Sequence, residues 1–277
     1  MKTLVPFTVV ALAFGILTSC RSAPSVSPPT EAHEGSTPLA KITSEAPNIG
    51  NHSIRNFRDA KKIAAKLHSE RGLTLYCRCR YAGKKIDGPS CGYEVDRSEK
   101  RASVLEWEHV VPAEAFGQSF SDWREGSDAC VSRKGKRYRG RKCAEKNPEF
   151  ARMEADLYNL FPEVGEVNGL RSNYSMAEVG ALGKFAGITF GGCEAKVFKS
   201  KFEPMDFAKG TVARAYFYME DAYPGRGIVS EKNRKLFEAW DKMHPVEPWE
   251  CDLYRRIRKV QTNPNPVLES RCGAASE

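Results

Sequence analysis

The sequence has few of the features that would set it apart from an ordinary globular protein. Beyond its first twenty residues it has no run of about eighteen consecutive apolar residues, so it offers no second candidate membrane span. It has no C-x2-C pair, which zinc sites usually show, and only five histidines. No internal repeat is evident. The composition, 41% hydrophobic and 28% charged, excludes a mainly disordered, collagen-like or coiled-coil chain.

The first fifty residues are predicted to precede the folded domain. Lys2 and an apolar stretch form a signal sequence that ends in Leu-Thr-Ser-Cys at residues 17–20. This ending resembles a bacterial lipobox, which predicts a signal peptide over 1–19 and a lipid on Cys20. An ordinary secretory signal peptide is the alternative. Residues 20–50 are rich in Pro, Ser and Thr and are expected to form a tether, which leaves 51–277 as the domain.

Eight further cysteines lie in the predicted domain. An even number in an exported chain predicts four disulfides. The rival interpretation is a zinc site that uses the thiolates of the first three cysteines. Eight cysteines allow 105 pairings; the one pairing we predict is Cys130–Cys143, at the base of a loop. The eight residues are Cys77, Cys79, Cys91, Cys130, Cys143, Cys193, Cys251 and Cys272.

Helical and strand patterns are mixed along the domain, which predicts one compact α+β fold. Ser53 is expected to cap a first helix that ends before Gly72, and short strands and loops should occupy 73–105. Asn147 and Pro148 are typical of a helix start. The remaining predicted elements are a strand over 104–107 and amphipathic helices over 211–223 and 230–243.

His109 is the histidine with the most informative neighbours. It follows Glu108 at the end of the predicted strand, whereas His68 is expected on the surface of the first helix. A carboxylate oxygen suits Mg²⁺, and an imidazole near pH 7 can take a proton from water. Taken alone, the pair is also compatible with a structural histidine.

Three segments then carry a resemblance to a known family. Residues 106–113 (EWEHVVPA), 153–160 (MEADLYNL) and 165–169 (GEVNG) look like those of the bacterial endonuclease I family. The resemblance spans roughly residues 55–272. It implies an exported, non-specific nuclease with a ββα-metal (His-Me finger) site in a disulfide-stapled α+β domain.

The resemblance also implies roles for individual residues. His109 would be the general base that activates water, while Glu108 and Asn168 would hold one Mg²⁺ ion. Asn159 would orient His109 by a hydrogen bond, and Arg141 would hold the cleaved phosphate. The chain departs from the family pattern in the spacing between Arg141 and the next cysteine, in an insertion before Arg141, and in Tyr158, where a histidine is common.

The insertion is strongly basic, and the net charge of +8 favours anionic partners. Its predicted nucleic-acid-binding residues are Arg133, Lys134, Lys136, Arg137, Tyr138 and Arg139. Basic side chains can follow a phosphate backbone, and the tyrosine can stack on a base. A solvated loop without such a role is the alternative.

These observations together predict a monomeric, Mg²⁺-dependent endonuclease of the bacterial envelope. Its substrate would be DNA, with RNA as a second candidate. The protein would be attached to the outer membrane only through its lipid and would face the periplasm or the exterior; a secreted or periplasmic protein without lipid is the alternative. Two other functions stay open, namely a non-catalytic DNA-binding envelope lipoprotein and a structural envelope lipoprotein.

Overall fold

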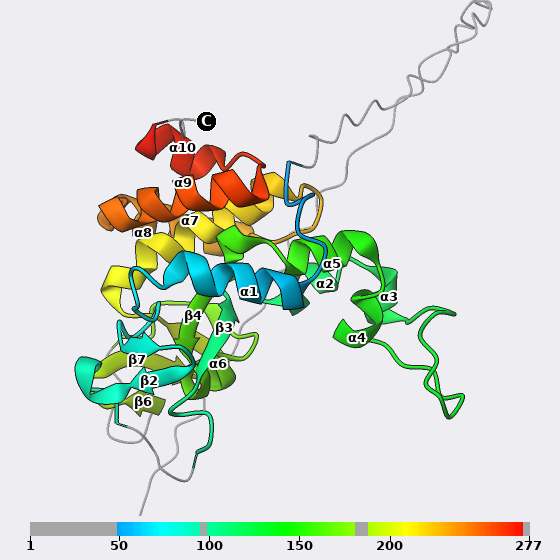
Figure 1. Ribbon diagram of the computed structural model, residues 1–277, viewed down its shortest axis with the longest axis horizontal. Coiled ribbons are helices and arrows are strands. Elements are labelled where there is room, and N and C mark those ends of the chain that lie inside the picture. The colour runs from blue at the N-terminus through cyan, green and yellow to red at the C-terminus, as the bar shows by residue number, and fades with distance from the viewer. Residues whose placement is uncertain (1–48, 95–98, 181–187, 274–277) are drawn as a thin grey trace, which may run out of the picture. The chain divides into compact units, whose positions relative to one another are not determined.

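The computed structural model describes residues 49–94, 99–180 and 188–273 (Figure 1). The predicted signal peptide, Cys20 and almost all of the tether lie outside these ranges. Helices and short strands are mixed along the chain, in runs of each kind, as the α+β prediction expected. Among the described residues, no helix is both long enough and apolar enough to cross a membrane.

Helix α1 (Phe57–His68) starts later than predicted, because its cap is Asn56 and not Ser53. The Asn56 side chain accepts a hydrogen bond from the Asp59 N–H at 3.0 Å, which satisfies a free donor of the first turn. The Ser53 hydroxyl donates instead to the Gln261 carbonyl at 2.8 Å, far away in the sequence. Ser53 therefore forms a long-range hydrogen bond and does not cap the helix.

Two antiparallel strands and a helix make up the ββα unit that carries the predicted site. Strand β3 (Leu105–His109) pairs with β4 (Leu160–Val164), with Leu105 opposite Val164 and His109 opposite Leu160. Helix α6 (Gly165–Arg171) follows β4 without a loop. All five residues of β4 are buried, as expected for a strand covered on both faces.

Short helices occupy the long connection between β3 and β4. The Asn147 side chain accepts from the Glu149 N–H at 3.0 Å and Pro148 follows, as the sequence predicted for this helix start. The elements of this connection are α2 (Ala113–Gly117), α3 (Ser121–Arg124), α4 (Arg141–Ala144), α5 (Pro148–Glu154) and the 3₁₀ turn η2 (Leu157–Asn159).

Two further small sheets lie beside the ββα unit. One is the hairpin of β1 (Arg80–Ala82) and β2 (Lys85–Asp87), which leads into the 3₁₀ turn η1 (Gly88–Cys91). The other has the order β5-β8-β7-β6, with β5 parallel to β8. Its strands are β5 (Ser175–Met176), β6 (Ile188–Phe190), β7 (Cys193–Phe198) and β8 (Lys201–Glu203).

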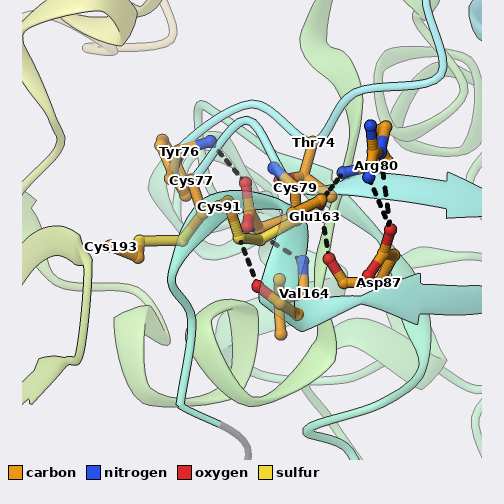
Figure 2. Close-up of a disulfide and its surroundings, with 12 residues drawn as sticks. Thr74, Tyr76, Cys77, Cys79, Arg80, Asp87, Cys91, Glu163, Val164 and Cys193 are labelled. Carbon is orange, nitrogen blue, oxygen red and sulfur yellow. Dashed lines mark hydrogen bonds and ion pairs between the residues drawn. A yellow bond between two sulfur atoms is a disulfide. The ribbon is translucent and has the colours of Figure 1, made fainter.

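All eight cysteines of the domain are paired. The predicted Cys130–Cys143 disulfide is confirmed, with Cα atoms 5.4 Å apart. The other three disulfides are Cys77–Cys193, Cys79–Cys91 and Cys251–Cys272. Figure 2 shows the first two of these converging on one short segment of chain. The zinc interpretation is therefore wrong, because its three thiolates are consumed in disulfides.

Four helices pack together at the C-terminal end of the chain (Figure 1). The helix predicted over 211–223 begins five residues earlier, whereas the helix predicted over 230–243 begins at Glu231, with Ser230 as its cap. These two are α7 (Asp206–Ala222) and α8 (Glu231–Met243). Helices α9 (Pro248–Gln261) and α10 (Pro266–Cys272) were not predicted. The side chain of Trp240 is fully buried in this layer.

Candidate active site

A cleft of about 1070 Å³ collects most of the predicted catalytic and metal-binding residues. Glu108, His109, Arg141 and Asn168 all line it, although they come from β3, α4 and α6. The cleft is basic, because its charged lining residues are seven cations and three carboxylates. The cations are Arg58, Lys61, Lys62, Lys84, Arg101, Arg141 and Arg171, and the carboxylates are Glu106, Glu108 and Glu114.

The His109 ring is held in one protonation state by its surroundings. Its Nε2 lies 2.8 Å from the Glu154 carbonyl oxygen. Because a carbonyl only accepts, Nε2 must carry the proton, and Nδ1 is left with the lone pair. Burial, reinforced by the positive charge of Arg141, lowers the pKa of His109 to about 3. The imidazole is therefore neutral at pH 7, which is the form that a base needs.

Asn159 acts on the backbone that follows His109, and not on the ring as predicted. Its side-chain Oδ1 accepts from the Val111 N–H at 2.7 Å, and its Nδ2 donates to the Val111 carbonyl at 2.9 Å. Both polar atoms of the Asn159 side chain are thus hydrogen-bonded to the backbone of Val111, which lies two residues after His109. The backbone carbonyl of Glu154 takes the orienting role that the sequence assigned to Asn159.

Glu108 is 2% exposed and uses one carboxylate oxygen for its contacts with protein. Oε1 accepts from the Tyr76 hydroxyl at 2.8 Å, and the Arg171 Nε lies 3.3 Å from the same oxygen. Burial raises the pKa of Glu108 to about 7, although Arg171 and the Tyr76 hydrogen bond act in the opposite direction. Among the hydrogen bonds of the described residues, none engages Oε2.

Asn168 presents its amide with a defined orientation. Its Nδ2 donates to Glu106 Oε2 at 2.9 Å, and Arg101 binds the same Glu106 carboxylate. A carboxylate partner accepts only, so it takes the amide nitrogen and leaves Oδ1 of Asn168 available. Glu106 and Glu108 share a face of β3 because strand side chains alternate, and this spacing was the signal that could have identified Glu106.

The two free oxygens, Oε2 of Glu108 and Oδ1 of Asn168, fit a Mg²⁺ ion. Mg²⁺ prefers oxygen ligands, keeps several waters and is usually bound by one or two protein carboxylates together with substrate phosphate. The described residues contain no group of three or more His, Cys, Asp or Glu that could hold a metal. A donor set of one carboxylate oxygen and one amide oxygen suits Mg²⁺.

Arg141 lies at the cleft with its side chain 41% exposed. Its Nε pairs with the carboxylate of Glu154, whose side chain is 2% exposed, and lies 3.8 Å from Glu145. The guanidinium is 5.3 Å from the centroid of the Phe57 ring, which itself lies 4.7 Å from the His109 ring. Glu154 thus contacts both Arg141 and His109, and these two residues also line the same cleft.

The basic insertion forms an exposed loop beside the cleft lining and is not part of it. Residues 133–137 are all exposed, and Arg137 pairs with Asp128 at 2.7 Å. The Val131 and Arg137 backbones form an isolated β-bridge, and Val131 directly follows Cys130 of the Cys130–Cys143 disulfide. None of the predicted nucleic-acid-binding residues from 133 to 139 lines the cleft. The loop protrudes from the region of α3 and α4 (Figure 1).

His68 is buried and not at the surface, which corrects the sequence prediction. It is 3% exposed, and its ring lies 5.6 Å from Trp107 and 5.5 Å from Phe161. Burial, together with Arg71 and Arg256, lowers the pKa of His68 to about 3. It packs under the ββα unit and is not among the residues that line the cleft.

A neutral histidine, a buried carboxylate and an amide oxygen in a basic cleft are compatible with a nuclease, and the comparisons with known proteins identify that class. The sequence model of the endonuclease I family matches residues 40–272, and the chain belongs to that family. An extracellular deoxyribonuclease of Aeromonas hydrophila is 41% identical over 225 residues, which cover 79% of this chain and 91% of the relative. A periplasmic deoxyribonuclease of the same organism is 40% identical, with 79% and 87% covered. Endonuclease-1 of Buchnera aphidicola subsp. Baizongia pistaciae is 38% identical, with 81% and 87% covered.

Proposed function

We propose that the protein is a Mg²⁺-dependent, sequence-non-specific endonuclease that hydrolyses phosphodiester bonds, with His109 as the general base. The observation that carries this proposal is the meeting of a neutral His109 with the free oxygens of Glu108 and Asn168 in one basic cleft. The arrangement supports the proposal of a ββα-metal site, which the family resemblance implies.

Each side chain has a separate task in this mechanism. Nδ1 of His109 takes a proton from the attacking water, while the Glu154 carbonyl holds the ring at Nε2. Glu108 and Asn168 would hold the Mg²⁺ ion, which supplies charge stabilisation to the scissile phosphate and the leaving oxygen. The Arg141 guanidinium can bind phosphate oxygens through its exposed edge, in keeping with its predicted role at the cleaved phosphate.

DNA is the proposed substrate, and RNA is the second candidate. Relatives of this chain bear the names extracellular and periplasmic deoxyribonuclease. Cations that meet the backbone carry no sequence information, so a basic cleft supports cleavage without sequence preference. The exposed residues of the basic loop would extend this surface along the phosphate backbone.

The protein is proposed to work as a monomer in the bacterial envelope. The names of its relatives support export to the periplasm or the exterior. A lipid on Cys20, within a Leu-Thr-Ser-Cys motif, would then attach it to the outer membrane. Metabolic labelling with a palmitate analogue tests this, because Cys20→Ser should abolish incorporation. Labelling that persists in Cys20→Ser would contradict the lipid site.

Supercoiled plasmid is the substrate for the test of function. The exported domain should nick and then degrade it with Mg²⁺ and should stop when EDTA is added. Glu108→Gln should lose most of the activity, whereas Glu114→Gln, which changes another cleft carboxylate, should keep it. Plasmid binding without cleavage in Mg²⁺ would favour the non-catalytic DNA-binding alternative, and unimpaired cleavage in EDTA would contradict the metal mechanism.

A further inference from the structure

Tyr76 contacts the predicted metal ligand Glu108 from outside the cleft. The residue is 0% exposed and does not line the cleft. Its hydroxyl donates to Glu108 Oε1 at 2.8 Å, and its ring packs on Phe202 with centroids 4.7 Å apart. The hydroxyl therefore engages Oε1, and no hydrogen bond among the described residues engages Oε2. Groups that hydrogen-bond to a ligand in this way fix its orientation toward the metal.

The backbone of Tyr76 is itself tightly held. Its N–H donates to Oε2 of Glu163, a fully buried carboxylate on β4, whose Oε1 accepts from the Val164 N–H at 2.9 Å (Figure 2). The neighbouring Leu75 N–H donates to the Pro162 carbonyl at 2.9 Å. Residues 75–76 are thus attached along β4, the strand that pairs with the strand carrying Glu108.

Two disulfides hold the chain directly after Tyr76. Cys77 is bonded to Cys193 on β7, and Cys79 is bonded to Cys91 at the end of η1 (Figure 2). The segment is therefore fixed on both sides, by β4 before Tyr76 and by the disulfides after it. A side chain on such a segment can place its hydroxyl with little freedom.

We propose that Tyr76 is a positioning residue for metal binding: its hydroxyl holds Oε1 of Glu108 so that Oε2 faces the ion. The proposal rests on the proposed function, since it takes Glu108 as a metal ligand. Loss of an outer contact of this kind typically costs about 10- to 100-fold in metal affinity or activity. Tyr76→Phe removes only the hydroxyl and leaves the ring on Phe202.

Mn²⁺ is the probe, because it takes the same oxygen ligands as Mg²⁺ and its free form is counted by electron paramagnetic resonance. Binding is measured on the disulfide-bonded protein without DNA. The matched control is Tyr218→Phe, which also removes a buried tyrosine hydroxyl from a buried carboxylate, Asp156, at 2.6 Å. Thermal unfolding of each variant, with and without Mn²⁺, gives a second measure of binding.

Tyr76→Phe is expected to raise the Mn²⁺ dissociation constant about 10-fold or more and to reduce the stabilisation by Mn²⁺. Tyr218→Phe should bind Mn²⁺ as the wild type does, even where its melting temperature falls. In plasmid cleavage, Tyr76→Phe should need more Mg²⁺ for half-maximal activity at an unchanged KM for DNA. Equal binding by Tyr76→Phe and wild type, or equal weakening by both variants, would overturn the positioning role alone. A wild-type protein that binds no Mn²⁺ and cleaves in EDTA would overturn the proposed function as well.

Discussion

The ion pair between Arg141 and Glu154 allows the two roles of Arg141 to be separated. Glu154 is buried, its backbone carbonyl holds His109, and its carboxylate has Arg141 as its partner. Arg141→Ala therefore removes a candidate phosphate ligand and also leaves a buried carboxylate without its cation. A loss of activity in this variant alone would not distinguish the two effects.

Their sizes can be worked out separately. Breaking a fully buried pair costs about 3–5 kcal/mol. The Arg141 side chain is 41% exposed, so solvent screening reduces the expected loss to roughly 1–2 kcal/mol of unfolding free energy. A charged hydrogen bond to phosphate contributes about 1.5–3 kcal/mol, and its loss lowers kcat about 13- to 160-fold.

The decisive variant is Arg141→Ala combined with Glu154→Gln. The second change removes the buried charge but keeps the backbone carbonyl that holds His109. We expect the double variant to regain most of the stability measured by urea unfolding, while its kcat at saturating DNA stays as low as that of Arg141→Ala. Glu154→Gln alone should keep a kcat near that of the wild type. A double variant that regains kcat together with stability would refute the phosphate role and make Arg141 a structural partner of Glu154.

Three other predictions concern the histidine below the site, the basic loop and the disulfides. The pKa of His68 is lowered to about 3 in the folded state, whereas its pKa in the unfolded chain is about 6.5. Between these two pH values the unfolded chain binds a proton that the folded protein does not. The stabilisation is therefore fully present above about pH 6.5 and is lost as the pH falls toward about 3. Urea unfolding at about pH 7.5 and about pH 5 should therefore show the wild type losing about 2 kcal/mol more than His68→Phe; equal losses would contradict the buried neutral imidazole. Replacement of four loop residues by serine should raise KM and leave kcat unchanged. It should also reduce the slope of log DNA affinity against log salt concentration by about 0.9 for each lost phosphate contact, for up to roughly four contacts. An unchanged salt slope would make the loop a solvated insertion. These four residues are Lys134, Lys136, Arg137 and Arg139. Reduction should unfold or inactivate the domain, because each disulfide typically contributes about 2–4 kcal/mol; far-UV circular dichroism and plasmid cleavage in reductant check this, and an active, folded reduced protein would contradict it.

Local sequence signals predicted the parts of the fold that local chemistry decides. Asn147 and Pro148 start α5, while α8 and the strand that ends in Glu108 and His109 each begin one residue from their predicted starts. At the start of α5, a side chain next to the helix satisfies the backbone of that same helix. Such contacts are visible in a short stretch of sequence.

Contacts between distant segments could not be predicted in this way. His68 has charged neighbours in sequence but packs against Trp107 and Phe161. Asn159 was expected to bind the His109 ring, but the turn of η2 brings its amide to the Val111 backbone. Since each of these partners is at least 39 residues away in sequence, the pairings follow from tertiary packing and leave no local pattern.

The measurement that tests the central claim most directly is single-turnover cleavage of a short DNA duplex by His109→Ala at saturating Mg²⁺ and protein. The control is His52→Ala, which changes an exposed histidine. A positioned general base contributes about 10²- to 10⁴-fold, so His109→Ala should cleave at least about 100-fold more slowly, with unchanged Mn²⁺ binding and unchanged DNA affinity. Cleavage by His109→Ala within a few-fold of the rate of the control would contradict the assignment of His109 as the base.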